Sequence, residues 1–221
     1  MTVLECYEYM QHRLNRLGTN FGDNIQKHVF VKAFNAQQLQ WAEDRIKLGE
    51  TNIVRKDEVQ QLLKDSTQTP SKNGSNYYEI NLPEDYFHYK RSVSYAPCEM
   101  RNILKKEGDI NTLLRDAFWK PSFDWGETLC TLIGNKLRIY TDIENTFSIS
   151  KVNLVYYRYP TPINMANGFT DVNGVTTTDI NPEFKGSSLI EILNATCQLL
   201  AADTSDQFNY QTLQQLNQKH T

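Results

Sequence analysis

The sequence predicts an α+β fold, in which helices from the two ends of the chain form a helical body around a small antiparallel β-rich part. Three observations predict it. Apolar residues recur with a helical period in the first third, with a period close to two residues in the middle, and again with a helical period after Pro182. We expect one structural domain with three regions. These are an N-terminal helical region (1–66), a β-rich region with hairpins and arms (67–181), and a C-terminal helix with a Gln-rich tail (182–221).

The N-terminal region predicts three helices. Thr2 and Glu5 have the capping-box spacing, in which each side chain binds the backbone N–H of the other residue. Apolar residues then recur every three or four positions, as in a first helix. A second helix is predicted over 23–49 and a short third one over 57–63. Residues 1–66 carry nine basic and nine acidic side chains, which favours packing over electrostatic steering as the role of this region.

The middle of the chain predicts strands. Turn-forming residue types interrupt the periodicity over 66–76, which we expect to be a loop. Gly134-Asn135 is typical of a two-residue hairpin turn, and a second hairpin is expected over 169–178. One or two helical turns are expected over 109–116. Runs rich in Thr, Val, Ile and aromatic residues predict five strands, at Tyr77–Leu82, Ser92–Ala96, Glu127–Ile133, Lys136–Tyr140 and Phe147–Tyr159.

The last third predicts one long helix over 187–202, with a broad apolar face. Neither this helix nor the N-terminal helices can bury such a face alone. We therefore expect them to pack together as one core, through Leu189, Ile192, Leu193 and Leu200.

Composition excludes several classes of protein. The formal net charge of −3 and the pI near 5.8 argue against a domain that binds phosphates non-specifically. No stretch approaches the roughly 18 apolar residues that a membrane span needs, so we expect no membrane association. The four cysteines have no C-x-x-C spacing and predict neither a zinc site nor a redox motif; they are Cys6, Cys98, Cys130 and Cys197.

Two groups of polar residues are candidates for a site. Glu84, Asp85 and His88 lie close together but lack the H-E-x-x-H order of a zinc helix, which favours a structural or surface role. Asp142 and Glu144 resemble an acid–base pair, yet they flank a polar turn, where acidic residues are common for conformational reasons. No nucleophile elbow and no phosphate-binding glycine motif occurs. We therefore predict no catalytic, cofactor-binding or metal-binding residues.

The basic run His88-Tyr89-Lys90-Arg91 alternates with aromatic residues. Such a run suits stacking on single-stranded nucleic acid. One short cluster next to acidic residues is more typical of a solvated edge strand, and this is the interpretation we favour.

Several longer segments together resemble a family of structural phage proteins. They are the helical FNAQQLQWAEDRIK, LPEDY before a strand, the hairpin TLIGNKLRIYTD, a strand ending in YYRYP, and the closing helix PEFKGSSLIEILNATCQLLAAD. Over residues 25–205 this order resembles the head-to-tail adaptor (connector or ring) proteins of tailed phages, most of all those of crAss-like phages. The Gln-rich tail after Asp206 is outside the resemblance.

The resemblance implies a non-enzymatic virion protein at the head-to-tail connector, present in the host cytoplasm during assembly. It implies a homo-oligomeric ring of about twelve copies, with the portal protein on one side and further tail or ring proteins on the other. Duplex DNA would pass through the ring without specific binding. Two alternatives stay open: another phage tail or capsid accessory protein, and a non-viral binding module or enzyme of unknown substrate.

A DNA channel should have a neutral or acidic wall, because cations that neutralise phosphates would hold the DNA. A bore lined by Lys90, Arg91, Lys105 and Lys106 would contradict a conduit. The acidic candidates for the channel wall are in the last third, at Asp179, Glu183, Glu191, Asp203 and Asp206. The alternative is that these five are ordinary solvated side chains on the outer wall.

Overall fold

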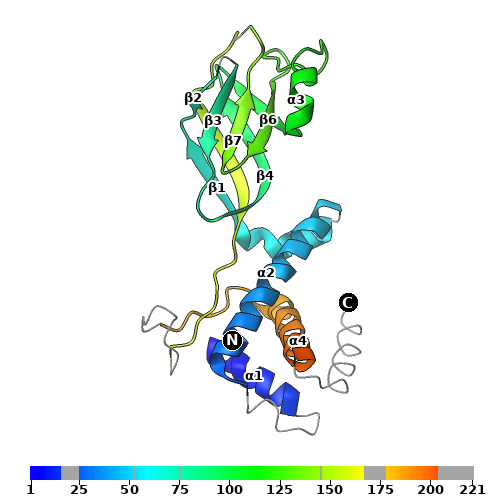
Figure 1. Cartoon of the computed structure of the whole chain (residues 1–221), viewed down its shortest axis with the longest axis vertical. Helices are drawn as coiled ribbons and strands as arrows, with labels where there is room; N and C mark the ends of the chain where they lie inside the picture. The colour runs from blue at the N-terminus through cyan, green and yellow to red at the C-terminus, as the bar shows by residue number, and fades with distance from the viewer. Residues whose placement is uncertain (16–24, 52, 75, 145, 167–177, 204–221) are drawn as a thin grey trace. The chain divides into compact units, whose positions relative to one another are not determined.

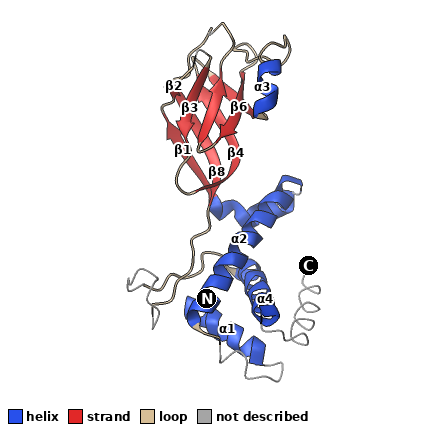
Figure 2. Ribbon diagram, in the orientation of Figure 1, coloured by secondary structure: helices blue, strands red, loops and turns tan. Residues whose placement is uncertain are grey.

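The computed structural model describes residues 1–15, 25–51, 53–74, 76–144, 146–166 and 178–203. The chain forms two compact units (Figure 1). We call Met1–Gln61 together with Pro160–Thr221 the helical unit, and Leu62–Tyr159 the sheet unit. Within the described residues, every strand belongs to the sheet unit (Figure 2).

The helical unit confirms most of the helices that the sequence predicts. Its elements are α1 (Val3–Asn15), α2 (Lys27–Thr51), the 3-10 helix η2 (Ile53–Leu62) and α4 (Gly186–Asp203). The capping box is present: the Thr2 N–H donates to Glu5 Oε2 (2.7 Å), and the Glu5 N–H donates to Thr2 Oγ1 (3.2 Å). The predicted third helix corresponds to η2, which ends one residue early because Leu63 begins a strand.

Helices from the first and the last third of the chain meet in the core of the helical unit. α4 contacts both α1 and α2. On α2, the Phe30 and Phe34 rings lie with centroids 5.9 Å apart, and Trp41 makes an edge contact with Phe184 at 4.8 Å. The expected packing of the last helix on the first ones is confirmed. Its four predicted contact residues are all buried: Leu189, Ile192, Leu193 and Leu200.

One buried cation joins three segments of the helical unit. Arg45 of α2 is 8% exposed, and its Nε lies 3.1 Å from Glu58 Oε2 in η2. Its guanidinium also binds the carboxylate of Glu191 in α4. Trp41 Nε1 donates to the same carboxylate (2.9 Å), and the Trp41 ring stacks on Arg45 with the guanidinium 5.5 Å from the ring centroid. These charge-assisted contacts fix how α2, η2 and α4 meet.

The sheet unit is one curled sheet of eight strands in the order β1-β8-β4-β5-β6-β7-β3-β2 (Figure 2). Neighbouring strands are antiparallel except β5 and β6, which are parallel and are linked through α3 (Glu107–Leu113). The strands are β1 (Leu63–Gln68), β2 (Ser71–Lys72), β3 (Tyr77–Asn81), β4 (Tyr86–Tyr95), β5 (Glu99–Leu104), β6 (Glu127–Ile133), β7 (Lys136–Tyr140) and β8 (Lys151–Arg158).

Apolar side chains are buried on both faces of this sheet. On one face, residues such as Met100, Ile139 and Leu154 form a large core cluster. Because alternate residues of a strand point to opposite faces, Leu129 and Tyr140 lie on the other face. There they pack with Ile110 of α3 and its neighbours. The small helix α3 therefore covers part of the second face.

A buried carboxylate ties β3 to its neighbours. Glu79 is 5% exposed and accepts hydrogen bonds from Asn73 Nδ2 (2.7 Å), Arg138 Nε (2.6 Å) and Lys136 Nζ (2.9 Å). The hydrogen bonds from Asn73, Arg138 and Lys136 lower the pKa of Glu79 to about 2. The ionised carboxylate thus belongs to the folded state at neutral pH.

The expected fold class is wrong. The β-rich part is not a small insertion in a helical body, since an eight-stranded sheet makes up a compact unit of its own. The error has a physical cause, because strands without apolar alternation leave no signal of period two. β1 has the sequence LKDSTQ, and the structure places it at the edge of the sheet, where its side chains are mostly exposed.

Polar residues also account for two further differences: β4 was predicted too short, and β5 was not predicted. The predicted strand over 92–96 is only the end of β4, whose first half contains the basic run His88–Arg91. β5 (EMRNIL) is short and exposes alternate polar residues. The loop expected over 66–76 is also wrong, because β1 continues to Gln68 and β2 follows at Ser71.

The predictions around the β6–β7 hairpin are confirmed. Both strands have the predicted bounds, and Gly134 in the turn adopts a φ of 55°. The helical turns expected over 109–116 correspond to α3. The second expected hairpin, turning at Asn173-Gly174, lies outside the described residues.

The unit boundaries follow the strands. The sheet unit begins at Leu62, ahead of the expected region boundary at 66/67, because β1 belongs to the sheet. It ends at Tyr159, directly after β8. The chain that follows is bound to α2 instead, since Asn35 Nδ2 donates to the Ile163 carbonyl (3.1 Å) and Gln38 Nε2 to the Thr161 carbonyl (2.9 Å).

Candidate functional site

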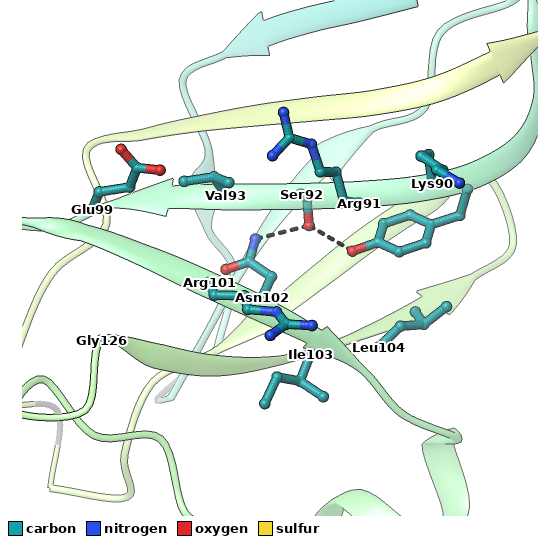
Figure 3. Close-up of a pocket in the computed structure, with 11 residues that line it drawn as sticks. Lys90, Arg91, Ser92, Val93, Glu99, Arg101, Asn102, Ile103, Leu104 and Gly126 are labelled. Carbon is teal, nitrogen blue, oxygen red and sulfur yellow. Dashed lines mark hydrogen bonds between the residues drawn. The ribbon is translucent and has the colours of Figure 1, made fainter. Parts of the chain in front are cut away.

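The β4–β5 hairpin opens into a groove. The two strands pair over four positions next to their turn, and the register ends at Ser92 and Asn102. β4 nevertheless extends back to Tyr86, and β5 extends forward to Leu104. The diverging strands bound a groove of about 700 Å³ (Figure 3).

The two strands diverge because each follows a different neighbour. β4 stays paired with β8 through two irregularities, between Tyr86 and His88 and between Tyr89 and Arg91. Bulges of this kind bend a strand and increase its twist. β5 instead pairs with β6 as far as Leu104. The groove is therefore built into the topology of the sheet.

A buried hydrogen-bond network lies where the two strands separate and forms the floor of the groove; Figure 3 shows its part around Ser92. Asn102 Nδ2 donates to Ser92 Oγ (2.9 Å), and Asn102 Oδ1 accepts from Ser94 Oγ (2.8 Å) and Thr128 Oγ1 (2.6 Å). The Tyr89 hydroxyl lies 3.0 Å from Ser92 Oγ. Both lone pairs of the amide oxygen are used, so this floor holds strands in place and offers no reactive group.

The cysteine beneath the groove is not activated. Cys130 Sγ lies 3.7 Å from the Tyr89 hydroxyl, and burial raises the pKa of the thiol to about 11. Burial also raises the pKa of Tyr89 above its ordinary value. A thiol protonated at neutral pH is a poor nucleophile. The other two buried cysteines have raised pKa values for the same reason, about 11 for Cys6 and about 12 for Cys197.

The rim of the groove is cationic. Arg91 and Lys90 come from β4, and Arg101 comes from β5 on the opposite wall (Figure 3). Both arginines are exposed, while Lys90 is half-buried with its ammonium 5.6 Å from the Tyr157 ring centroid. Among the lining residues the opposing charge comes from Glu99 alone. The groove thus joins three cations, one carboxylate and a neutral polar floor.

A second exposed surface lies between α3 and β6. We call residues 116–126 the aromatic loop, because four large aromatic side chains within it are exposed to solvent. The loop is held by hydrogen bonds: the Phe118 N–H donates to Asp116 Oδ1 (2.8 Å), and Ser122 and Glu127 exchange backbone hydrogen bonds. The exposed fractions are 76% for Phe118, 53% for Trp119, 40% for Phe123 and 60% for Trp125.

The first group of candidate residues has a structural role. Asp85 Oδ2 lies 2.7 Å from Lys64 Nζ, and Asp85 Oδ1 accepts a hydrogen bond from the Tyr156 hydroxyl (2.7 Å). The hydrogen bond from Lys64 lowers the pKa of Asp85. Glu84 and His88 are exposed. Within the described ranges, no three His, Cys, Asp or Glu residues are grouped so as to hold a metal ion.

The second group, Asp142 and Glu144, lies in a turn, and the contact of Asp142 stabilises the conformation of that turn. Asp142 Oδ1 accepts a hydrogen bond from the Thr146 backbone N–H (2.8 Å), which stabilises the turn after β7. Glu144 is exposed in the same turn. The structure gives the pair no shared partner among the described residues.

The basic run forms part of β4, which as a whole lies between β8 and β5 in the sheet. The β5 ladder covers only Ser92–Tyr95, so among the described strands residues 88–91 pair with β8 alone and keep one open side, as in an edge strand. The shape of the groove leaves no local signal in the sequence, because it depends on where two strands separate. One signal was present: cations recur on both sides of the Ala96–Cys98 turn, at Lys90, Arg91 and Arg101.

Three of the acidic residues in the last third make contacts inside the helical unit. Asp179 accepts from the Ala166 N–H (2.6 Å), Glu183 accepts from the Thr161 N–H (3.1 Å), and Glu191 binds Arg45. The Asp203 side chain and Asp206 lie outside what the structure describes.

No family model matches the chain, and no curated protein matches it. None of the described helices combines the length and apolar character needed to cross a bilayer.

Proposed function

We propose that the chain is a structural virion protein, a ring-forming head-to-tail adaptor that joins the portal to the tail of a phage and surrounds the DNA channel. The observation that carries the proposal is the aromatic loop. Exposed aromatic side chains gathered in one ordered segment are typical of protein–protein contacts. They support a chain that works in an assembly, as the family resemblance of its sequence implies.

The ring geometry gives the aromatic loop a partner. A ring needs a head-to-tail interface, in which one surface of each copy contacts a different surface of the next copy. In the proposed assembly the loop supplies one side of that interface. Phe118, Trp119 and Trp125 are the contact residues we assign to it, since they are the most exposed of the four aromatics. Buried aromatic residues commonly dominate the energy of such contacts.

Charge supports the conduit role. Each copy carries a formal charge of −3, so a ring of about twelve copies carries net negative charge. Such a ring lets DNA pass without the salt-sensitive affinity that a cationic wall would create. In the proposed assembly the cationic rim at Arg91 and Arg101 faces protein and not the channel.

The proposal is tested on virions. Antibodies against this chain should label the junction between head and tail in electron micrographs of particles from cells that encode it. Mass spectrometry of purified particles should give about twelve copies for each portal ring. Labelling of the head surface or the tail tip would favour an accessory protein, and absence from particles would overturn the virion role. A ring bore lined by Lys90, Arg91, Lys105 and Lys106 would contradict the conduit.

A variant tests the role of the aromatic loop. Phe118→Ser combined with Trp125→Ser should abolish joining of heads to tails, measured as the fraction of tailed particles. The free energy of unfolding should change by less than about 0.5 kcal/mol for each residue, because both side chains are exposed. Ile143→Ser is the matched control, since Ile143 is 58% exposed outside the loop. Normal particles with the double variant would exclude the loop from assembly.

A further inference from the structure

We propose that the groove between β4 and β5 binds an extended, acidic peptide segment of a partner protein, which adds as a strand beside Tyr89–Arg91. The inference goes beyond the adaptor proposal, because it concerns what this groove recognises and not which assembly contains the chain. Three properties of the groove carry it: open strand edges, a preformed shape and a cationic rim.

The first property is the pair of open strand edges. Over Tyr89–Arg91, β4 pairs with β8 on one side, and no described strand pairs with its other side. Across the groove, Ile103 and Leu104 of β5 pair with β6 on one side. On the side that faces β4, no described strand pairs with these two residues. Open edges bind extended peptides through backbone hydrogen bonds. An extended segment is therefore the backbone shape that this groove matches.

The second property is that the groove is preformed. Asn102 binds Ser92, Ser94 and Thr128, and these bonds lock the point at which the hairpin opens. The volume of about 700 Å³ lies within the range of roughly 300–1,000 Å³ that is usual for ligand sites. A site that already has its bound shape loses less entropy on binding.

The third property is charge. Arg91 and Arg101 stand on opposite walls, Lys90 lies beside Arg91, and Glu99 is the opposing carboxylate. Guanidinium groups form paired hydrogen bonds with carboxylates. In an extended peptide, alternate side chains point to the same side. A segment with Glu or Asp at alternate positions would therefore present its carboxylates to these cations.

The lining favours a peptide over single-stranded nucleic acid. Proteins that bind single strands through phosphates also stack bases on aromatic rings. Among the residues that line the groove, Tyr89 is the one aromatic, and its hydroxyl is bound to Ser92 at the floor. The groove thus offers cations for an acidic ligand but no free aromatic ring on which a base could stack.

The experiment measures binding of fluorescein-labelled probe peptides to the full chain by fluorescence anisotropy at physiological salt. The probe is a short peptide of alternating Thr and Glu. Two control peptides replace Glu by Lys, or the central Thr by Pro, which cannot complete a strand ladder. Labelled oligothymidylate is the nucleic-acid probe. Hydrogen exchange, followed by mass spectrometry, reports whether the Tyr89–Arg91 amides become protected when the Glu peptide binds.

The expected result is binding of the Glu peptide alone, with slower exchange at Tyr89–Arg91. Arg91→Glu combined with Arg101→Glu should raise its Kd about tenfold or more, because paired charge contacts are lost and reversed. Both arginines are exposed, so this variant keeps the fold. The matched control is Lys32→Glu combined with Arg115→Glu, which changes the net charge equally at exposed positions outside the groove. Its Kd should stay within about twofold.

Four results would overturn the inference: no binding of the Glu peptide, equal binding by the Arg91/Arg101 variant, equal binding of the Pro peptide, or tighter binding of oligothymidylate. The last result would identify a nucleic-acid site. None of them bears on the location of the chain in virions, so the inference and the adaptor proposal fail separately.

Discussion

The helical unit and the sheet unit are assembled from the chain in different ways. In the helical unit, α4 packs apolar side chains against helices from the other end of the chain, so its core forms only when two distant segments meet. The sheet unit is one continuous segment, and its ladders surround polar networks centred on Asn102 and Glu79. We conclude that the helical unit depends on contact between two distant segments, through apolar area and the Arg45 ion pairs, whereas the sheet unit depends on strand ladders and buried polar networks within one segment.

The strongest test of this comparison is a cavity in the helical unit. Leu193 is fully buried in α4, and Leu193→Ala should lower the free energy of unfolding by about 2–5 kcal/mol. Hydrogen exchange on the full chain should show faster exchange in α1, α2 and α4. Leu4→Ala is the control, because Leu4 is 49% exposed, and its effect should stay below about 0.5 kcal/mol. Equal loss of protection in the strands would show that the two units unfold together, and the comparison would fail.

A smaller effect is expected from the neutral network of the sheet unit. Asn102→Ala removes the acceptor of the buried Ser94 and Thr128 hydroxyls and one of the two partners of the Ser92 hydroxyl. A buried polar group without a partner costs about 1–3 kcal/mol, so urea unfolding followed through the sheet-unit amides should shift by that amount. Asn111→Ala at an exposed position of α3 is the control. If both variants are equally stable, the network contributes nothing to the sheet unit.

A third effect, which depends on pH, sharpens the comparison. The pKa of Glu79 is about 2 in the folded state against 4.5 ordinarily. A lowered folded pKa gives stability that is fully present above pH 4.5 and is lost as the pH falls towards 2. The urea midpoint of the sheet unit should therefore fall between pH 5 and pH 3, and part of this fall should disappear in Glu79→Gln. Glu144→Gln, at an exposed position, should behave like the unaltered chain; an equal change there would exclude Glu79 as the source.

Local signals in the sequence predicted the elements whose side chains follow a clear period. The capping box at Thr2 and Glu5 and the Gly134 hairpin were predicted because a few neighbouring residues decide them. β1 was missed because an edge strand needs no apolar face, and its partner β8 lies far along the chain. Because strands of this kind have no apolar alternation, the sequence predicted too small a sheet, and the predicted fold class was wrong as a result.

The candidate site was less predictable than the fold. The cations at Lys90, Arg91 and Arg101 are visible in the sequence, but the groove exists because β4 follows β8 while β5 follows β6. That divergence depends on pairings between distant segments. The role of Asp85 was similarly undecided until Lys64 and Tyr156 were placed beside it.

The sequence by itself determined the helices at both ends and the β6–β7 hairpin, because periodicity and turn chemistry are properties of neighbouring residues. It also predicted that α4 packs on the N-terminal helices, because each has an apolar face that it cannot bury alone. Only the tertiary structure decided that the middle segment forms an eight-stranded sheet, that β4 pairs with β5 along only part of its length, and that three cations share one groove. The physical reason is that strand pairing is a contact between distant segments. Its register is set when the whole sheet buries its apolar faces, and no short stretch of sequence specifies it.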